Sequence, residues 1–200
     1  MGPMRGHRRA ALRLGPLGGA LLAALVLLAR PARAEELAER QGARVGVSLL
    51  LGVGELSGSS GVSTTAPLVG ASFRFGGAFT DRVHLYGEFT LATLPNARFG
   101  GTSEPAFLGA LDLCVQVYVL PRLYVRAGIG AVDHATLGST DYWSYPGPHI
   151  VGGVGYDLQR RGERAFSLEL SVADEFFSTG GSSPYGGGYT VNLGAAFDWF

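Results

Sequence analysis

Acidic residues and histidines in one stretch of the chain offer side chains that could bind a metal ion. Asp133, His134, Asp141 and His149 lie close together in the sequence, and carboxylates and imidazoles are ligands for divalent ions. Their spacing matches no metal-binding pattern, however. The sequence therefore predicts no metal site, no catalytic site and no cofactor.

A second group consists of seven ionisable side chains that recur among small or polar residues. Ser72, Thr90 and Ser171 are examples of neighbours two positions away from a charge. A charge that is buried without a partner is costly, so a set with both signs is expected to pair inside the protein. The group comprises Arg74, His84, Glu88, Asp112, Arg126, Asp157 and Glu169.

Distances from the nearest short turns predict which of these charges meet. Arg74 and Glu88 flank residues 80–82 at similar heights, and Asp112 and Arg126 flank residues 119–122. We therefore expect one ion pair across each turn. The network is expected to be structural, and the alternative is that it gates a passage for small ions.

Aromatic side chains form a third group, in two expected loops. They fit either a girdle at the level of lipid headgroups, which we favour, or a surface patch that binds a protein or glycan partner. The six are Tyr142, Trp143, Tyr145, Phe176, Phe177 and Tyr185.

The elements that position these groups are strands. In residues 45–54, apolar side chains at the odd positions alternate with small residues and Leu50 at the even ones, the period of two that sends neighbours to opposite faces of a strand. The pattern recurs at 67–79, 83–92, 106–118, 123–132, 149–158, 165–175 and 189–200. Each segment is close to the ~9–11 residues that a tilted strand needs to cross a bilayer.

The expected connections alternate in length. Long, glycine-containing connections at 55–66, 93–105, 133–148 and 176–188 alternate with short turns at 80–82, 119–122 and 159–164. Short periplasmic turns and long external loops are typical of bacterial membrane barrels. With eight strands, this order places both chain ends in the periplasm.

The first 34 residues have the composition of a signal peptide. They contain six arginines and no acid, an apolar run at 14–28 that is short for a membrane helix, and Ala32-Arg33-Ala34 as a cleavage motif. Cleavage leaves ten basic and 16 acidic residues, a net charge of −6, which disfavours nucleic acid as a partner.

The single Cys114 can form no internal disulfide. We expect a signal peptide at 1–34, a periplasmic lead at 35–43 and one barrel domain at 44–200.

The distribution of charged and apolar residues between the two strand faces predicts which face points into the lumen and which contacts lipid. The seven ionisable residues occupy one face, and the opposite faces carry apolar residues such as Phe73, Leu111 and Ile129. A soluble lipocalin-like barrel would need the reverse arrangement. The sequence therefore predicts an all-β fold, an eight-stranded antiparallel up-and-down transmembrane β-barrel with a polar lumen filled by side chains.

This architecture resembles the small eight-stranded outer-membrane barrels of the OmpA and OmpX type across residues 44–200. The resemblance implies location in the cell outer membrane of a Gram-negative bacterium, contact with outer-membrane lipid and recognition by the barrel assembly machinery. Phe200 provides the terminal aromatic residue of such barrels. In the alternation of the last strand, however, Trp199 and not Phe200 falls on a position expected to face lipid.

The resemblance leaves three functions to compare. The first is a non-enzymatic barrel that contributes to envelope structure and presents loops to a partner that the sequence does not name. The second is a narrow, porin-like passage for ions or small solutes. The third is a lipid A-modifying enzyme, which is disfavoured because no histidine is followed two positions later by serine: Tyr86, Thr136 and Val151 hold those positions.

Overall fold

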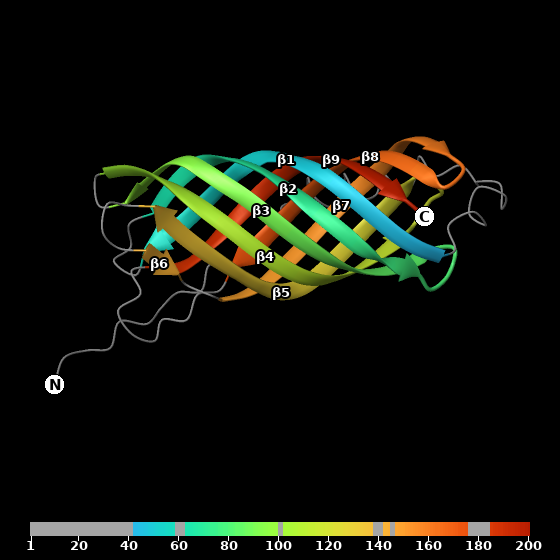
Figure 1. Ribbon diagram of the computed structural model, residues 1–200, viewed down its shortest axis with the longest axis horizontal. Coiled ribbons are helices and arrows are strands. Elements are labelled where there is room, and N and C mark those ends of the chain that lie inside the picture. The colour runs from blue at the N-terminus through green and yellow to red at the C-terminus, as the bar shows by residue number, and fades with distance from the viewer. Residues whose placement is uncertain (1–41, 59–62, 100–101, 138–141, 145–146, 176–184) are drawn as a thin grey trace, which may run out of the picture. The chain divides into compact units, whose positions relative to one another are not determined.

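The computed structural model describes residues 42–58, 63–99, 102–137, 142–144, 147–175 and 185–200 (Figure 1). The predicted signal peptide at 1–34 and most of the predicted lead at 35–43 lie outside these residues. Gly42 and Ala43, the last residues of the predicted lead, pair with Ala78 and Gly77.

Nine strands are found in the described residues. They are β1 (Gly42–Gly58), β2 (Ser63–Ala78), β3 (Val83–Phe99), β4 (Thr102–Tyr118), β5 (Leu123–Leu137), β6 (Tyr142–Ser144), β7 (Gly147–Arg161), β8 (Arg164–Glu175) and β9 (Tyr185–Trp199). Within the same residues, no helix is long and apolar enough to span a bilayer.

Eight of these strands close into a ring. Each long strand pairs antiparallel with the next long strand along the chain, β1 pairs with β9, and the three-residue β6 only extends the edge of β5. Strands tilted across a closed wall leave no free sheet edge (Figure 1). The predicted eight-stranded antiparallel up-and-down barrel is confirmed.

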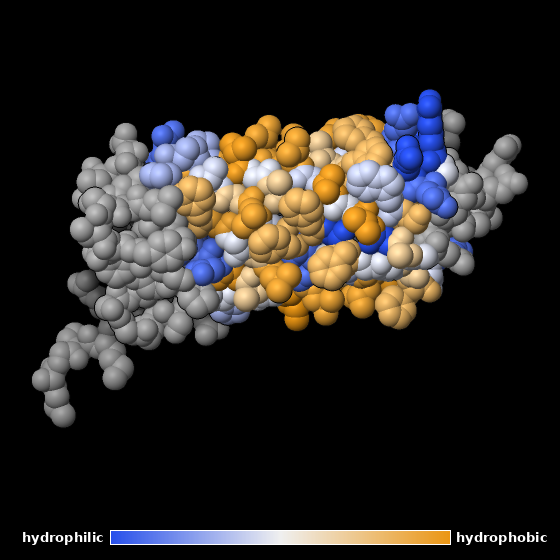
Figure 2. Space-filling view, in the orientation of Figure 1, coloured by the Kyte–Doolittle hydropathy of each residue, from blue (hydrophilic) through white to orange (hydrophobic). Residues whose placement is uncertain are grey.

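The two faces of the wall differ as the alternation predicts. In β8, exposed and buried side chains alternate without exception from Arg164 to Glu175. Large apolar side chains point outward, among them Leu49 at 70% and Ile129 at 67% exposed. Figure 2 shows them as an apolar band between more hydrophilic ends of the barrel.

The strands are longer at one end of the barrel than the sequence predicts. Pairing continues to Ser57 and Ser63 between β1 and β2, and to Phe99 and Thr102 between β3 and β4. The predicted long connections at 55–66 and 93–105 are therefore wrong, since most of these residues are paired. Backbone hydrogen bonds continue beyond the point where alternation of apolar side chains stops.

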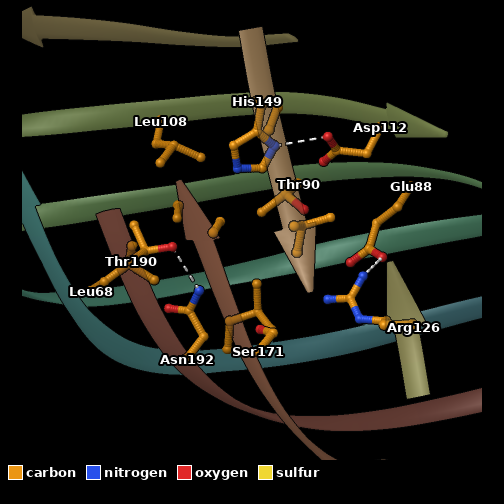
Figure 3. A pocket seen from close by; sticks show the side chains of 15 residues that line it. Leu68, Glu88, Thr90, Leu108, Asp112, Arg126, His149, Ser171, Thr190 and Asn192 are labelled. Atoms are coloured by element: carbon orange, nitrogen blue, oxygen red, sulfur yellow. Dashed lines mark hydrogen bonds and ion pairs between the residues drawn. The ribbon is translucent and has the colours of Figure 1, made fainter. Parts of the chain in front are cut away.

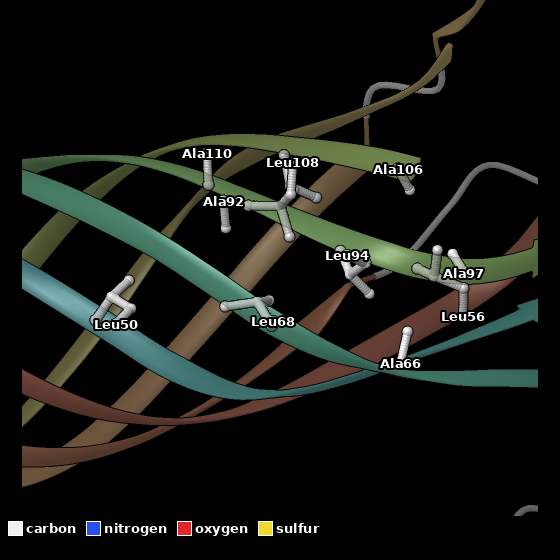
Figure 4. Close-up of a cluster of buried hydrophobic side chains, with 11 residues drawn as sticks. Leu50, Leu56, Ala66, Leu68, Ala92, Leu94, Ala97, Ala106, Leu108 and Ala110 are labelled. Carbon is white, nitrogen blue, oxygen red and sulfur yellow. The ribbon is translucent and has the colours of Figure 1, made fainter. Parts of the chain in front are cut away.

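The lumen contains an apolar segment that the sequence reading did not include. This segment, here called the apolar plug (Figure 4), lies toward the end of the barrel opposite the short turns, since Leu56 and Leu94 pair with Thr64 and Ala106 near that end. Part of the lumen is therefore apolar. The plug consists of Leu50, Leu56, Ala66, Leu68, Ala92, Leu94, Ala97, Ala106, Leu108, Ala110 and Val132.

Candidate functional site in the barrel lumen

Two arginines and two glutamates form a neutral cluster in the lumen, here called the charge quartet. Arg74 contacts Glu88 at 3.3 Å through Nε and Glu169 at 2.9 Å through Nη2. Arg126 contacts Glu88 at 2.5 Å through Nη1 and Glu169 at 2.7 Å through Nε. Each carboxylate thus lies between two guanidinium groups, and all four side chains are buried.

Strand register explains part of this geometry. Arg74 on β2 is the direct cross-strand partner of Glu88 on β3, and the ion pair predicted between them is present. Arg126 on β5 and Glu169 on β8 reach the others across the lumen. The closed ring is what brings these four strands around one point.

The second predicted ion pair, between Asp112 and Arg126, is wrong. Register places Asp112 opposite Gly130, and Arg126 opposite Gln116. Asp112 Oδ1 instead contacts His149 Nδ1 at 2.8 Å. In register, Arg126 lies four residues from the position opposite Asp112. Asp112 and His149 are both direct partners of Gly130, which has no side chain to separate them.

A second ion pair lies nearer the short turns. Arg44 donates to both carboxylate oxygens of Asp198, at 3.0 and 2.8 Å, and to Gln116 Oε1 at 2.8 Å. Its guanidinium also lies 4.8 Å from the centre of the Tyr86 ring. Sequence reasoning missed this pair, because its members lie at opposite ends of the barrel domain and meet only through β1–β9 pairing.

The remaining predicted lumen residues are also buried near the short turns. The His84 ring lies 5.3 Å from Tyr118 and 5.5 Å from Phe200, centre to centre. Asp157 is buried as well. Phe200 therefore turns toward the barrel mouth, whereas Trp199 points outward.

The four possible metal ligands near residue 140 are not brought together. Asp133 is exposed on the outer face, whereas His134 and His149 are buried in the lumen with Glu175 and Asp112 as separate partners. Asp141 lies outside the described residues. Among the residues described, no group of three potential ligands is found.

A small cavity separates the charge quartet from the apolar plug (Figure 3). Its volume is about 30 Å³, and Glu88, Arg126, Asp112 and His149 line its polar side. One water molecule occupies about 30 Å³ in the liquid. The cavity thus has room for water but not for an organic substrate, even though an Asp–His pair borders it.

The predicted loop aromatics are only partly described. Tyr142 and Trp143 belong to β6 and Tyr185 begins β9. Tyr145, Phe176 and Phe177 lie outside the described residues. A girdle or binding patch formed by these side chains stays a prediction.

Solved structures with the same architecture are small outer-membrane barrels. Neisserial surface protein A matches 80% of this chain and 99% of its own, with 14% identity and a TM-score of 0.53. Ail, the attachment invasion locus protein of Yersinia pestis, matches 78% of this chain and 99% of its own, with 10% identity and a TM-score of 0.51. That structure holds the heparin analogue sucrose octasulfate.

These likenesses define the class of fold. No family model matches the chain, and no curated protein matches it by sequence. At such low identity the likeness concerns the fold alone: the chain folds as a small barrel of the OmpA and OmpX type.

Proposed function

We propose that this chain is a non-enzymatic barrel of the bacterial outer membrane, which contributes to envelope structure and presents loops for surface interaction. The observation that carries the proposal is the division between faces. Large apolar side chains point outward on every long strand, whereas the charge quartet is buried inside. Apolar patches of this extent are rare on soluble monomers.

The reverse orientation is physically unfavourable. An arginine facing lipid at the bilayer midplane costs about 2–4 kcal/mol. Inside the barrel, Arg74 and Arg126 instead meet two carboxylates each. The buried quartet and the apolar outer surface are therefore consistent with a lipid environment.

The lumen favours a structural role over a passage. Charged side chains close around one another in the quartet, and Leu50, Leu68 and Leu108 border the small cavity from the plug side. Water is poorly retained between apolar side chains, and apolar constrictions are one way in which pores are closed. We propose that the closed barrel does not conduct appreciably.

The lumen also gives little support to an enzymatic role. The Asp112–His149 pair could orient a general base, but a cavity of about 30 Å³ next to it admits no lipid substrate. The partners that we propose are outer-membrane lipid, the assembly machinery during biogenesis, and a loop ligand of a class not yet assigned. Nucleic acid is not among them.

A refolding experiment tests this proposal. Residues 35–200 would be refolded into phospholipid vesicles and run on SDS gels with and without boiling. We expect a heat-dependent mobility shift and no steady single-channel conductance in planar bilayers. Absence of a shift, with a chain that stays soluble without detergent, would contradict the membrane barrel, and ohmic conductance would contradict the closed lumen.

A further inference from the structure

A pair of arginines on the β7–β8 hairpin lies at the edge of the apolar band. Arg161 and Arg164 are direct cross-strand partners on either side of the turn Gly162–Glu163, and both are exposed. Gly162 has φ +53°, a conformation that favours glycine and lets the chain reverse within two residues. The turn therefore holds two positive charges side by side.

Two like charges opposite each other in a sheet are unfavourable unless an anion lies between them. Within the described part of the chain, neither arginine has an ion-paired carboxylate. The neighbouring Arg160 adds a third positive charge, and its three guanidinium nitrogens are buried without an acceptor. The hairpin thus combines three cations with one acid, Glu163.

A cleft of about 160 Å³ lies on the outer wall beside this pair. It is lined by Gln159, Arg161, Arg164, Ala165, Phe166 and Phe197. Phe166 and Phe197 are paired in register and continue the apolar band. In Figure 2 the hydrophilic cluster at the tip of the β7–β8 hairpin directly adjoins apolar side chains.

We infer that this cleft binds the phosphate of an anionic phospholipid in the periplasmic leaflet, an inference that rests on the proposed membrane location. The guanidinium groups of Arg161 and Arg164 bind the phosphate oxygens, since arginine offers paired N–H donors to phosphate. Gln159 contributes a polar side chain to the headgroup site, and the acyl chains lie along Phe166 and Phe197. The arrangement joins a cationic site to an apolar surface, as a lipid requires.

The charge distribution supports this occupant. The short turns carry the exposed arginines Arg82 and Arg122 as well as this pair, although the predicted mature chain is acidic overall. Cationic side chains near an anionic leaflet contribute to membrane binding. Arg161 and Arg164 lie beside a cleft whose walls include the aromatic side chains of Phe166 and Phe197.

Native mass spectrometry of the refolded residues 35–200 tests the inference. Phosphatidylglycerol would be titrated against the wild type, an Arg161→Gln/Arg164→Gln variant and a matched Arg82→Gln/Arg122→Gln control. Loss of two arginines from the cleft is expected to weaken phosphatidylglycerol binding about tenfold or more. The control, which has the same net charge, is expected to change it less than about threefold.

Several outcomes would overturn the inference. Equal weakening in both double variants would mean that the charge of the whole rim attracts lipid. If phosphatidylcholine with the same acyl chains binds as tightly as phosphatidylglycerol, the arginines do not select an anionic lipid. Displacement of the lipid by millimolar inorganic phosphate would mean that the site binds free phosphate.

The same samples separate this inference from the proposed function. Each variant is first checked for the heat-dependent gel shift of a folded barrel. A wild type without the shift would contradict the membrane barrel itself. Folded variants that all bind phosphatidylglycerol equally would contradict only the lipid site.

Discussion

Removing one carboxylate from the charge quartet is expected to destabilise the barrel strongly. Glu88 lies 3.3 Å from Arg74 and 2.5 Å from Arg126, so Glu88→Gln leaves two buried guanidinium groups with Glu169 as their shared carboxylate. Breaking a buried pair by removing one partner costs about 3–5 kcal/mol. We expect the free energy of unfolding to fall by about that amount.

The assay is urea unfolding of the refolded chain in lipid vesicles, followed by tryptophan fluorescence. Glu163→Gln is the matched control, because it removes the same charge from an exposed turn and is expected to change stability by less than about 0.5 kcal/mol.

A second substitution makes the test specific to charge balance. Glu88→Gln combined with Arg126→Gln restores neutrality and leaves the Arg74–Glu169 contact of 2.9 Å. The double variant is expected to recover at least about half of the lost stability, since contacting residues show coupled effects. A loss below about 1 kcal/mol for Glu88→Gln, or no recovery in the double variant, would refute the reasoning.

Three further predictions follow from burial. Leu111, at 57% exposed, lies on the outer face. Leu111→Arg is expected to make folding into vesicles less favourable by about 2–4 kcal/mol, and unchanged folding would contradict lipid contact at this position. Leu94→Ala in the plug, at 1% exposed, is expected to lower stability by about 2–5 kcal/mol in urea unfolding without opening the lumen to ions; conductance through this variant would show that the plug alone closes the barrel. Cys114, which is fully buried, is expected to react with a maleimide only after boiling in SDS, and rapid labelling of the folded chain would contradict its packing.

The sequence predicted the fold well because one physical requirement repeats in every strand. The alternation that places Phe73 outward and Arg74 inward also assigns Glu88, Arg126 and Glu169 to the interior, and it needs no knowledge of tertiary contacts. Residues on adjacent strands near a turn, such as Arg74 and Glu88, were also within reach of such reasoning.

Contacts made through ring closure were not predictable in the same way. Arg44 and Asp198 meet because the first and last long strands pair. Asp112 meets His149 because both lie opposite Gly130, which has no side chain to keep them apart. A rule that pairs the first and last strands of a predicted barrel would have suggested the Arg44–Asp198 contact.

The apolar plug escaped prediction for a different reason. Leu56 and Leu94 lie where the outward alternation stops, so they were assigned to loops. Leu50 shares the inward parity of the alternation at 45–54, but one leucine among small residues did not indicate an apolar segment of the lumen. Only the register of the extended strands assigns Leu56 and Leu94 to the lumen.

The central claim is that the outer wall contacts acyl chains, and tryptophan quenching tests it most directly. Single tryptophans would be introduced at Leu111 and Leu193, on β4 and β9, in a chain with Trp143→Phe and Trp199→Phe. In vesicles of lipids with brominated acyl chains, both are expected to be strongly quenched, whereas a tryptophan at Thr80 in a short turn is not. Equal, weak quenching at all three positions would contradict a lipid-embedded wall.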